Sequence, residues 1–195
     1  MLNENQLSEL KSAITCLLLS TQREGMPDLI DWLNRSGFFE SPASSKYHGC
    51  YKGGLARHSL NVYELLCTKN ARYQLGCDDN TMVISALLHD VCKVGAYIGN
   101  GQSYKWNRQQ PKGHALLSLS RIADFMELTE LESAMIRYHM GIYGSTAFEP
   151  DKGEYDVRGG GLAHAWFHYP IVKVMYFCDE FATFQEQAEE KETIE

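Results

Sequence analysis

Residues 81–94 read TMVISALLHDVCKV, and the rest of the chain is organised around this stretch. Apolar residues occupy almost every position before and after the His89-Asp90 pair, which predicts a helix that is buried on all sides. Asp90 and Lys93 are three positions apart and His89 and Lys93 are four apart, so the three side chains project from one side of such a helix. Because an unpaired carboxylate is costly to bury, the segment predicts a charge partner or a bound metal for Asp90. Further histidines elsewhere in the chain favour the metal.

The composition is that of an ordinary globular protein. A chain of 195 residues is long enough to bury one sizeable core without disulfides or structural metals. The six cysteines include no C-x-x-C pair and several lie in apolar runs, which favours buried, reduced thiols and a cytoplasmic location. The first residues lack a basic signal region, and the apolar run at residues 17–19 is too short for a bilayer. We therefore expect neither secretion nor membrane anchoring.

The formal net charge of −7 is unevenly distributed. Residues 186–195 contain five Glu and one Lys, and we expect them to form a frayed or disordered tail. Residues 46–112, which include the His-Asp pair, contain nine Lys or Arg against four Asp or Glu. This local excess of positive charge predicts a field that attracts a phosphate-bearing ligand.

Apolar residues recur at helical spacing in several other segments. Helix starts are indicated by Pro27, by the acidic cluster that begins at Asp78, and by the capping box of Thr129 and Glu132. The predicted helices cover residues 7–19, 27–34, 55–67, 81–94, 114–126, 130–141 and 170–180. Because no segment gives a convincing hairpin signal, we predict an all-α fold.

We expect one structural domain with three parts. Helices in residues 1–45 cover the core, residues 46–185 carry the candidate site, and residues 186–195 form the acidic tail. Two long segments rich in glycine, residues 95–113 and 142–161, are predicted to be loops. Loops of that length in a compact domain are usually functional or mobile.

Six residues recur on or at the ends of the predicted helices, in the order His58, His89, Asp90, His114, His139 and Asp179. This order resembles the HD-domain superfamily of metal-dependent phosphohydrolases, whose signature is H, then HD, then D. Members that hold two metals have two more histidines between HD and the last D. The segments GGLARHSL (53–60) and LLHDVCK (87–93) match the first two blocks. The resemblance covers residues 47–184 and is closest to small stand-alone HD hydrolases and to the HD domain of certain 3′-5′ exoribonucleases.

This resemblance implies an HD-domain-like helical bundle in which the two long loops lie near a metal site. It implies that one divalent ion is held by four residues, which are His58, His89, Asp90 and Asp179. A second ion would be held by His114 and His139, with Asp90 bridging the two ions. The donor chemistry agrees, because imidazole and carboxylate ligands suit Mn, Fe, Ni, Mg or Zn, and the set contains no thiolate that would indicate structural zinc.

Within this resemblance, Asp90 and Lys93 are the expected catalytic residues, and Arg57, Lys93 and Arg108 are expected to bind the substrate. Lys93 would offer a point charge to a phosphate oxygen as negative charge develops, and Arg57 beside His58 could do the same. An aromatic and basic set is open to two interpretations, stacking on a base or capping the helix bundle. The set consists of Tyr47, Tyr51, Tyr104, Trp106 and Arg108.

The remaining histidines and two cysteines have simpler interpretations. His48, His164 and His168 follow no ligand spacing, and we expect surface or structural positions, with substrate contact as the alternative. Cys92 and Cys178 flank expected ligands, but adjacent helix positions point about 100° apart, so we expect both thiols to pack in the core.

The leading hypothesis is a metal-dependent phosphohydrolase that uses metal-activated water on a phosphomonoester or phosphodiester. The substrate would be a nucleotide or a short single-stranded oligonucleotide. A free nucleotide is favoured over long RNA because the chain is acidic overall and has no added nucleic-acid-binding segment. The alternative is a non-catalytic HD module that binds a nucleotide or a protein partner around a structural metal. The apolar run at 115–117, where the family often has polar residues, motivates this alternative.

Overall fold

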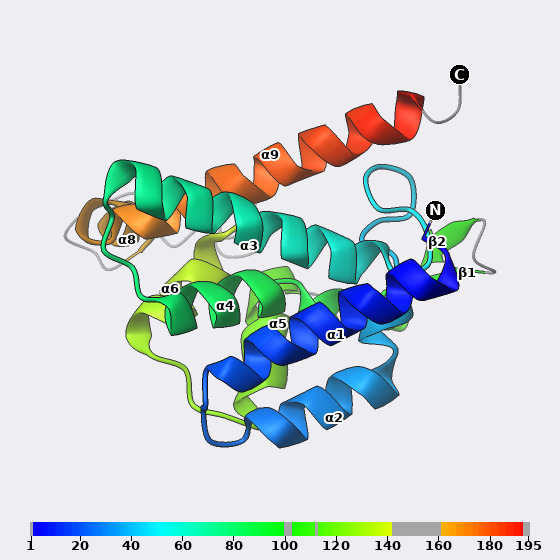
Figure 1. The fold of residues 1–195 in the computed structure, drawn as a ribbon, viewed down its shortest axis with the longest axis horizontal. Coiled ribbons are helices and arrows are strands. Elements are labelled where there is room, and N and C mark those ends of the chain that lie inside the picture. Colours follow the sequence, from blue (N-terminus) through cyan, green and yellow to red (C-terminus); the bar gives the residue numbers. More distant parts are fainter. Residues whose placement is uncertain (1, 100–102, 112, 142–160, 193–195) are drawn as a thin grey trace.

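The computed structural model of the protein describes residues 2–99, 103–111, 113–141 and 161–192, and these are mostly helical (Figure 1). The helices are α1 Glu4–Ser20, α2 Met26–Ser36, η1 Phe38–Glu40, α3 Gly54–Tyr73, α4 Asp79–Leu88, η2 Val91–Lys93, α5 His114–Ala123, α6 Glu130–Tyr138, α8 Leu162–His168 and α9 Pro170–Glu192. Strands β1 Tyr97–Gly99 and β2 Tyr104–Trp106 form the only sheet in the described part of the chain. The all-α prediction is confirmed. None of the described helices is both long enough and apolar enough to span a membrane.

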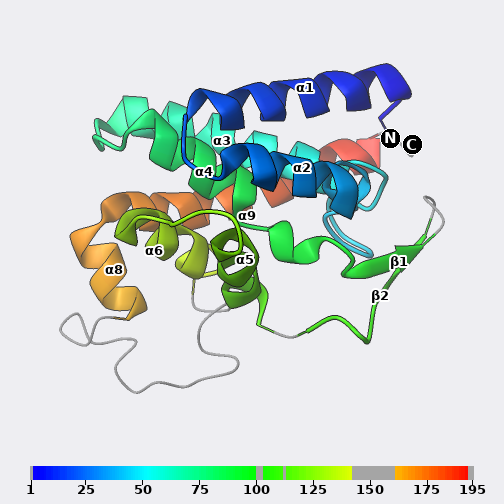
Figure 2. The same ribbon diagram turned by 90° about the horizontal axis from the view of Figure 1, so that it is seen from below.

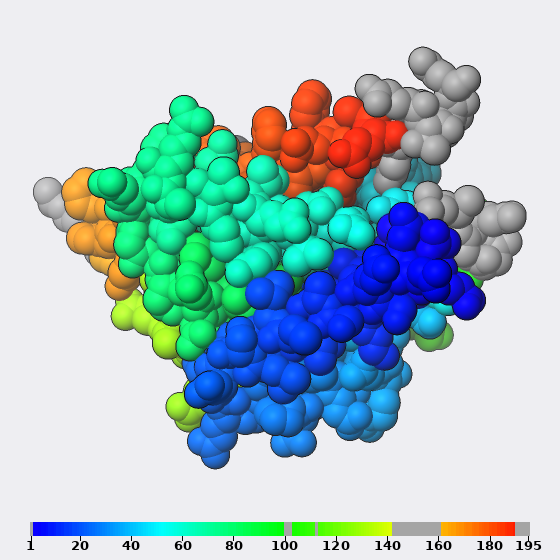
Figure 3. Space-filling view, in the orientation of Figure 1, coloured from blue at the N-terminus to red at the C-terminus, as the bar shows by residue number. Residues whose placement is uncertain are grey.

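Helix α4 lies at the centre of the molecule. Every residue from Thr81 to Leu88 is buried, as the unbroken apolar pattern predicts. Helix α3 packs against α4 on one side and α9 on another, and α6 packs against both α4 and α9. Figure 2 shows α1 and α2 along one edge of the molecule and α6, α8 and α9 along the other, with α4 between them. Figure 3 shows α3 at the surface between α1 and α9.

Two hydrophobic clusters meet at α4. Leu87 belongs to the cluster that also contains Ile14 of α1 and Leu29 of α2. Its neighbour Ala86 belongs to the other cluster, which contains Val172 of α9. Because successive helical side chains point about 100° apart, neighbours on α4 bury themselves in different clusters, and the helix fixes both halves of the molecule relative to the site at its end.

Side-chain caps determine where three of the helices begin. Asn3 and Thr129 each take part in a reciprocal capping box, at the starts of α1 and α6. At α4 the Asp78 carboxylate accepts hydrogen bonds from the Thr81 N–H at 3.0 Å and from its hydroxyl at 2.7 Å. These oxygens satisfy amide groups that have no partner within the helix.

The prediction of one continuous helix over residues 81–94 is wrong in its second half. Helix α4 ends at Leu88, Asp90 has φ −109° and ψ 15°, and a short 3-10 turn follows. The physical reason lies in His89, whose ring Nδ1 is 2.8 Å from the Ala86 carbonyl oxygen and satisfies it at the helix end. Lys93 nevertheless stays beside Asp90, because its N–H donates to the Asp90 carbonyl oxygen at 2.9 Å.

The structure also differs from the prediction in the segment expected to be a loop at residues 95–113. Two three-residue strands pair antiparallel there, with Tyr97 opposite Trp106. Their rings meet edge to face with centroids 5.7 Å apart, which is a favourable cross-strand pair. Strands of three residues are too short to show an alternating pattern, so no hairpin signal is visible in the sequence. The second predicted loop falls almost entirely on residues 142–160, which lie outside the described residues.

The expected tail at residues 186–195 is a third difference. Helix α9 continues to Glu192, twelve residues beyond the predicted end at 180. Glu186, the first residue assigned to the tail, is only 5% exposed. The charge count was correct but could not reveal that one of these carboxylates has a buried partner. All six cysteines are free, but only Cys92 and Cys178 are buried as expected, whereas Cys16 is exposed.

Candidate metal centre

The six predicted ligand residues meet at one place inside the bundle. His58 comes from the first turns of α3, His89 and Asp90 follow α4, His114 begins α5, His139 follows α6, and Asp179 lies within α9. Five of the six residues are buried, and His114 is partly exposed. Helices far apart in the sequence therefore deliver one imidazole or carboxylate group each, or two in the case of the segment after α4.

Asp90 lies between two pairs of histidines. Its Oδ2 faces His58 Nε2 at 3.9 Å and His89 Nε2 at 3.4 Å. Its Oδ1 faces His114 Nε2 at 2.8 Å and His139 Nε2 at 3.6 Å. One carboxylate thus presents each of its oxygens to a different pair of imidazoles, the arrangement that a bridging ligand requires.

Asp179 completes the side of the site that contains His58 and His89. Its Oδ1 lies 2.9 Å from His58 Nε2 and 3.8 Å from His89 Nε2. Two sets of donor atoms result, one of His58, His89, Asp90 and Asp179, the other of Asp90, His114 and His139. Within each compact group of three that these residues form, the ligand atoms lie within 4.8 Å of one another.

Helix ends orient two of the histidines. His89 Nδ1 lies 2.8 Å from the Ala86 carbonyl oxygen, and His139 Nδ1 lies 2.6 Å from that of Ile136. Each ring follows the last residue of its helix and bonds a carbonyl three positions back, where helical partners are missing. A carbonyl only accepts, so Nδ1 carries the proton and Nε2 is left as a lone-pair donor aimed at the site.

A carboxylate orients His58. Both oxygens of Glu186 are near His58 Nδ1, at 3.2 and 3.3 Å, and Asn61 Nδ2 donates to the same carboxylate at 2.7 Å. Such an outer carboxylate fixes the tautomer of a ligating histidine and increases its basicity. Sequence reasoning missed Glu186 and Asn61. Helical spacing could have identified both residues. Glu186 lies seven residues after Asp179 on one helix face, and Asn61 lies three residues after His58.

Charges and burial compete at the site. Burial tends to raise the pKa of Asp90, but the Lys93 ammonium at 2.6 Å, together with His89 and His114, holds it well below its usual value. Burial tends to lower the pKa of His58, but hydrogen bonds to Asp179 and Glu186 outweigh it and raise the pKa to about 10. Burial lowers the pKa of His114, which keeps that ring neutral and able to act as a ligand.

Several buried polar atoms of the cluster have no hydrogen-bond partner. They are Asp90 Oδ1 and the Nε2 atoms of His89, His114 and His139, although Asp90 Oδ1 and His114 Nε2 lie within ion-pair distance of each other at 2.8 Å. Buried polar atoms are normally satisfied, so four orphaned atoms that face one another indicate a missing cation rather than a packed polar core. Imidazole nitrogens and carboxylate oxygens are the donors that Mn, Fe, Ni and Zn accept, and the residues present fit one or two divalent ions.

The site opens on the side of His114 and Lys93. The His114 side chain is 32% exposed and that of Lys93 is 13% exposed, whereas the other ligand side chains are at most 9% exposed. A cavity of about 270 Å³ adjoins these two residues, and Tyr97, Trp106 and Leu117 also line it. A ligand that reaches the metal-binding atoms can therefore place a further group against aromatic rings.

The other predicted binding residues lie elsewhere. Arg57 lines a separate groove of about 640 Å³, together with Tyr51 and Asn61, which shares no lining residue with the cavity at His114. Arg108 is exposed after β2, and no interaction of its side chain is described. Of the predicted aromatic set, Trp106 alone lines the cavity at His114, so the structure brings together only part of that set.

The three histidines without ligand spacing separate into two groups. His164 and His168 pack against each other in α8, with ring centroids 4.2 Å apart and the ring planes tilted by 42°. His48 lies beside the cluster instead, with its ring centroid 4.7 Å from that of His58. Burial, followed by the nearby His58 and Lys93 charges, lowers the pKa of His48 to about 4.

Comparison with known families identifies one match. The model of the HD domain matches residues 55–165, more than half of the chain. The matched segment contains His58, His89, Asp90, His114 and His139, and the structure adds Asp179 from α9 to this group. Comparison with curated proteins and with solved structures gives no match for the chain.

Proposed function

The chain belongs to the HD-domain family, whose members are generally metal-dependent hydrolases, and on this premise we propose that it hydrolyses a phosphate ester of a nucleotide or short oligonucleotide. One observation carries the proposal. Asp90 is almost fully buried, presents each oxygen to a different pair of histidines, and has a lysine beside it at the opening of the site. A cluster built only for stability would not leave four donor atoms unsatisfied.

Each residue has a role in this proposal. His58, His89, Asp90 and Asp179 would hold one ion, and Asp90, His114 and His139 would hold a second. When bound, divalent ions acidify a coordinated water and neutralise charge on the phosphoryl group. The protein fixes the ligand directions through the Nδ1 contacts of its histidines, so that the site does not reorganise when charge develops.

Lys93 is the proposed contact for the phosphoryl group. In the structure its ammonium lies 2.6 Å from Asp90 Oδ2, and Asp90 raises the pKa of Lys93 despite the opposing effect of burial. The lysine therefore remains charged at neutral pH. When Asp90 is engaged by cations, the ammonium is available to donate to a non-bridging phosphate oxygen and to stabilise the charge that develops there.

The cavity at His114 supports a nucleotide as the substrate. Tyr97 and Trp106 offer aromatic faces and edges within the same cavity that Lys93 and His114 border. A planar base can stack on such a surface while its phosphate reaches the metal-binding atoms. The overall charge of −7 favours a mononucleotide or short strand over long nucleic acid, because extended polyanions bind through many phosphate contacts.

The proposal is tested by metal content and turnover measured on the same samples. We expect Asp90→Ala to lose nearly all bound metal and all metal-dependent hydrolysis of nucleoside monophosphates and short oligonucleotides. His114→Ala serves as a second variant, because its partly exposed side chain can be removed with less risk to folding. His168→Ala, at an exposed position of α8, is the control and should retain metal binding and hydrolysis.

Two results would contradict the proposal. Unchanged turnover in Asp90→Ala would show that the cluster does not catalyse the reaction. A metal-loaded wild type that binds nucleotides and gains thermal stability but forms no product would favour the non-catalytic binding module. The dependence of binding on salt would separate the two substrate classes, because affinity for an oligonucleotide falls more steeply with salt than affinity for a mononucleotide.

A further inference from the structure

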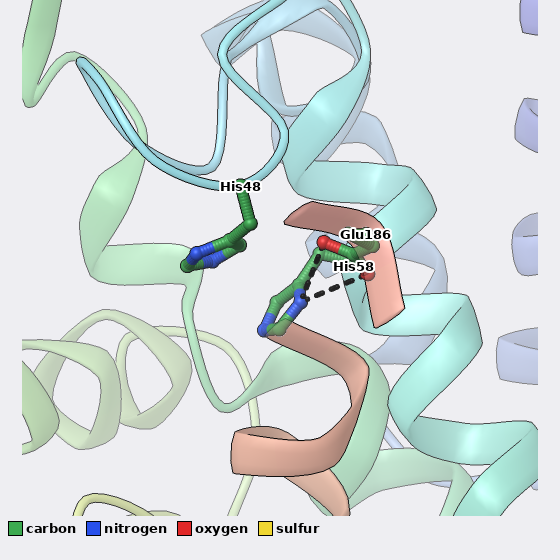
Figure 4. A group of neighbouring side chains, drawn as sticks. All are labelled: His48, His58 and Glu186. Carbon is green, nitrogen blue, oxygen red and sulfur yellow. Dashed lines mark hydrogen bonds and ion pairs between the residues drawn. The ribbon is translucent and has the colours of Figure 1, made fainter. Parts of the chain in front are cut away.

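His48 is the one histidine near the metal centre that has no role in the proposed ligand set. Both of its ring nitrogens are buried, and neither has a hydrogen-bond partner among the described residues. Figure 4 shows the His48 ring beside His58, whose other edge faces Glu186. A histidine buried only for packing normally satisfies at least one nitrogen, so this ring indicates a ligand that completes it.

The backbone of the loop before α3 holds His48 in place. The Ser44 hydroxyl donates to the His48 carbonyl oxygen at 2.8 Å and accepts from the Tyr47 N–H at 2.8 Å. The Ala43 N–H donates to the Gly49 carbonyl oxygen at 2.9 Å. Gly49 has φ +58°, and a Cβ there would lie 2.7 Å from Ala43 Cβ, so the close approach of the two strands of the loop requires glycine.

This arrangement fixes the backbone at His48 without using the nitrogens of its ring. The hydrogen bonds of the loop involve the backbone and a serine, and they leave both ring nitrogens of His48 available. Groups that must contact a ligand are held in this way at binding sites, where the supporting residues carry the positional constraint. His48 is thus positioned in advance and unsatisfied.

A third metal ion does not account for His48. The ligand atoms of His48, His58 and Glu186 do lie within 4.8 Å of one another. However, His58 Nδ1 already bonds Glu186, and its Nε2 lies 2.9 Å from Asp179 Oδ1. An ion held by His48, His58 and Glu186 together would take His58 Nδ1 as a ligand while Nε2 serves the proposed centre, so the ring would have to lose both of its protons, whereas a neutral imidazole keeps one.

The position of His48 favours a substrate contact instead. Its ring packs against that of His58, whose Nε2 faces Asp90 Oδ2. Lys93 approaches the same oxygen of Asp90 at 2.6 Å. The charges of Lys93 and Asp90 both act on the His48 ring, so His48 lies near Lys93 at the metal centre, and each can supply an N–H group to an anion held there.

We propose that His48 is a substrate-binding residue, which donates a ring N–H to a phosphoryl oxygen of the ester at the metal centre. This inference deepens the proposed function and rests on it, because it places the phosphate on the side of Asp90 that faces His58 and Lys93. It adds a contact to the substrate and leaves the number of bound metal ions unchanged.

Two substitutions separate hydrogen bonding from packing. His48→Phe keeps a planar ring but removes the donor, and His48→Gln keeps an N–H donor but removes the ring. Orthophosphate is the probe, and its affinity for the metal-loaded protein is measured by calorimetry together with metal content per chain. His168→Phe, at an exposed position of α8, is the matched control.

We expect unchanged metal content in all variants and a loss of orthophosphate affinity of about tenfold or more in His48→Phe, the effect of one hydrogen bond to a charged group. His48→Gln should lose less, and the control should lose nothing. With an ester that the wild type hydrolyses, kcat/KM should fall in the same order. Thermal melting of each variant checks that the fold is retained.

Two results would overturn the inference. Equal orthophosphate affinity in wild type and His48→Phe, or no affinity in the metal-loaded wild type, would mean that the ring only packs. Loss of an ion in His48→Gln would make His48 a metal ligand. The proposed function fails by a different result. If orthophosphate affinity depends on His48 but the protein hydrolyses no ester, the phosphate contact of His48 stands and the proposal of an enzyme is wrong.

Discussion

Individual histidines at this site have one nitrogen engaged by the protein and the other directed to the centre. His89 and His139 reach this state in the same way, through the carbonyl three residues back at a helix end. His58 reaches it through Glu186. The shared consequence is that the Nε2 atoms converge on Asp90 with fixed ring orientations, which prepares the residues for a cation before one binds.

Lys93 gives the first prediction at this scale. Replacing it by Met keeps the length of the side chain but removes the charge that would stabilise the developing negative charge on phosphate. We expect kcat/KM to fall about 100-fold, the effect of losing one preorganised donor, while metal content stays the same. Lys93→Arg is the control for charge and should retain more activity. Unchanged steady-state kinetics in Lys93→Met would exclude the role proposed for Lys93.

Glu186 gives the second. Glu186→Gln weakens the acceptor that orients His58, and we expect the affinity for the divalent ion to fall about 10- to 100-fold. The measurement is a competition titration with a metal chelator. Glu189 is an exposed residue three positions further along α9. Glu189→Gln is therefore the matched control and should bind metal like the wild type. Equal affinities of the two variants would show that Glu186 is only a packing residue.

At the scale of helices, α9 supplies two different functions to the site from one face. Asp179 provides a ligand and Glu186, two turns later, provides the group that orients another ligand. Helix α4 contributes differently, because it ends where the chemistry begins and is held by both hydrophobic clusters. A substitution that disturbs the start of α4 should therefore change the stability of the fold more than the activity of the site.

The cap of α4 gives a prediction with a pH dependence. We expect Asp78→Ala to lower the free energy of unfolding by about 1 kcal/mol at pH 7, while Asp78→Asn, which also caps well, should lose much less. Partial burial tends to raise the pKa of Asp78, but the hydrogen bonds from Thr81 outweigh burial and lower this pKa below 3.8. A carboxylate with a lowered pKa stabilises the fold above its unfolded pKa and loses that effect as the pH falls through the folded value.

Denaturant titrations at several pH values measure this effect. The difference between wild type and Asp78→Ala should be complete at neutral pH and should shrink below about pH 4. A difference that is constant from neutral to acid pH would mean that the charge of Asp78 contributes nothing and that only its shape matters.

At the scale of the whole molecule, the site connects α3, α4, α5, α6 and α9, so metal binding should stabilise the entire fold. We expect a divalent ion at about 100 times its dissociation constant to add about 2.7 kcal/mol to the free energy of unfolding. For a chain of this length this corresponds to a rise in Tm of about 5–10 °C. Differential scanning calorimetry of chelator-treated protein with added Mn or Zn measures it. An unchanged Tm in an excess of metal ion would show that the ligands do not bind an ion in the folded state.

Much of the fold was accessible from local pattern. The buried character of α4, the capping boxes and the helix-rich composition are visible in neighbouring residues, because helix formation depends on spacing and caps over a few turns. The break at His89, the hairpin at Tyr97 and the extension of α9 were missed. Each depends on a partner that is either too local to show periodicity or too distant to be seen in sequence.

The sequence by itself determined the class of fold and the six candidate ligands, because ordered His and Asp residues on successive helices carry a recognisable signature. Only the tertiary structure decided how those residues act. It directs the two oxygens of Asp90 to different histidines, pairs His58 with Glu186, and places His48 unsatisfied beside them. It also places Arg57 in a separate groove. The physical reason is that ligand direction and hydrogen-bond satisfaction depend on contacts between elements far apart in the sequence, up to 128 residues for His58 and Glu186, which no local pattern contains.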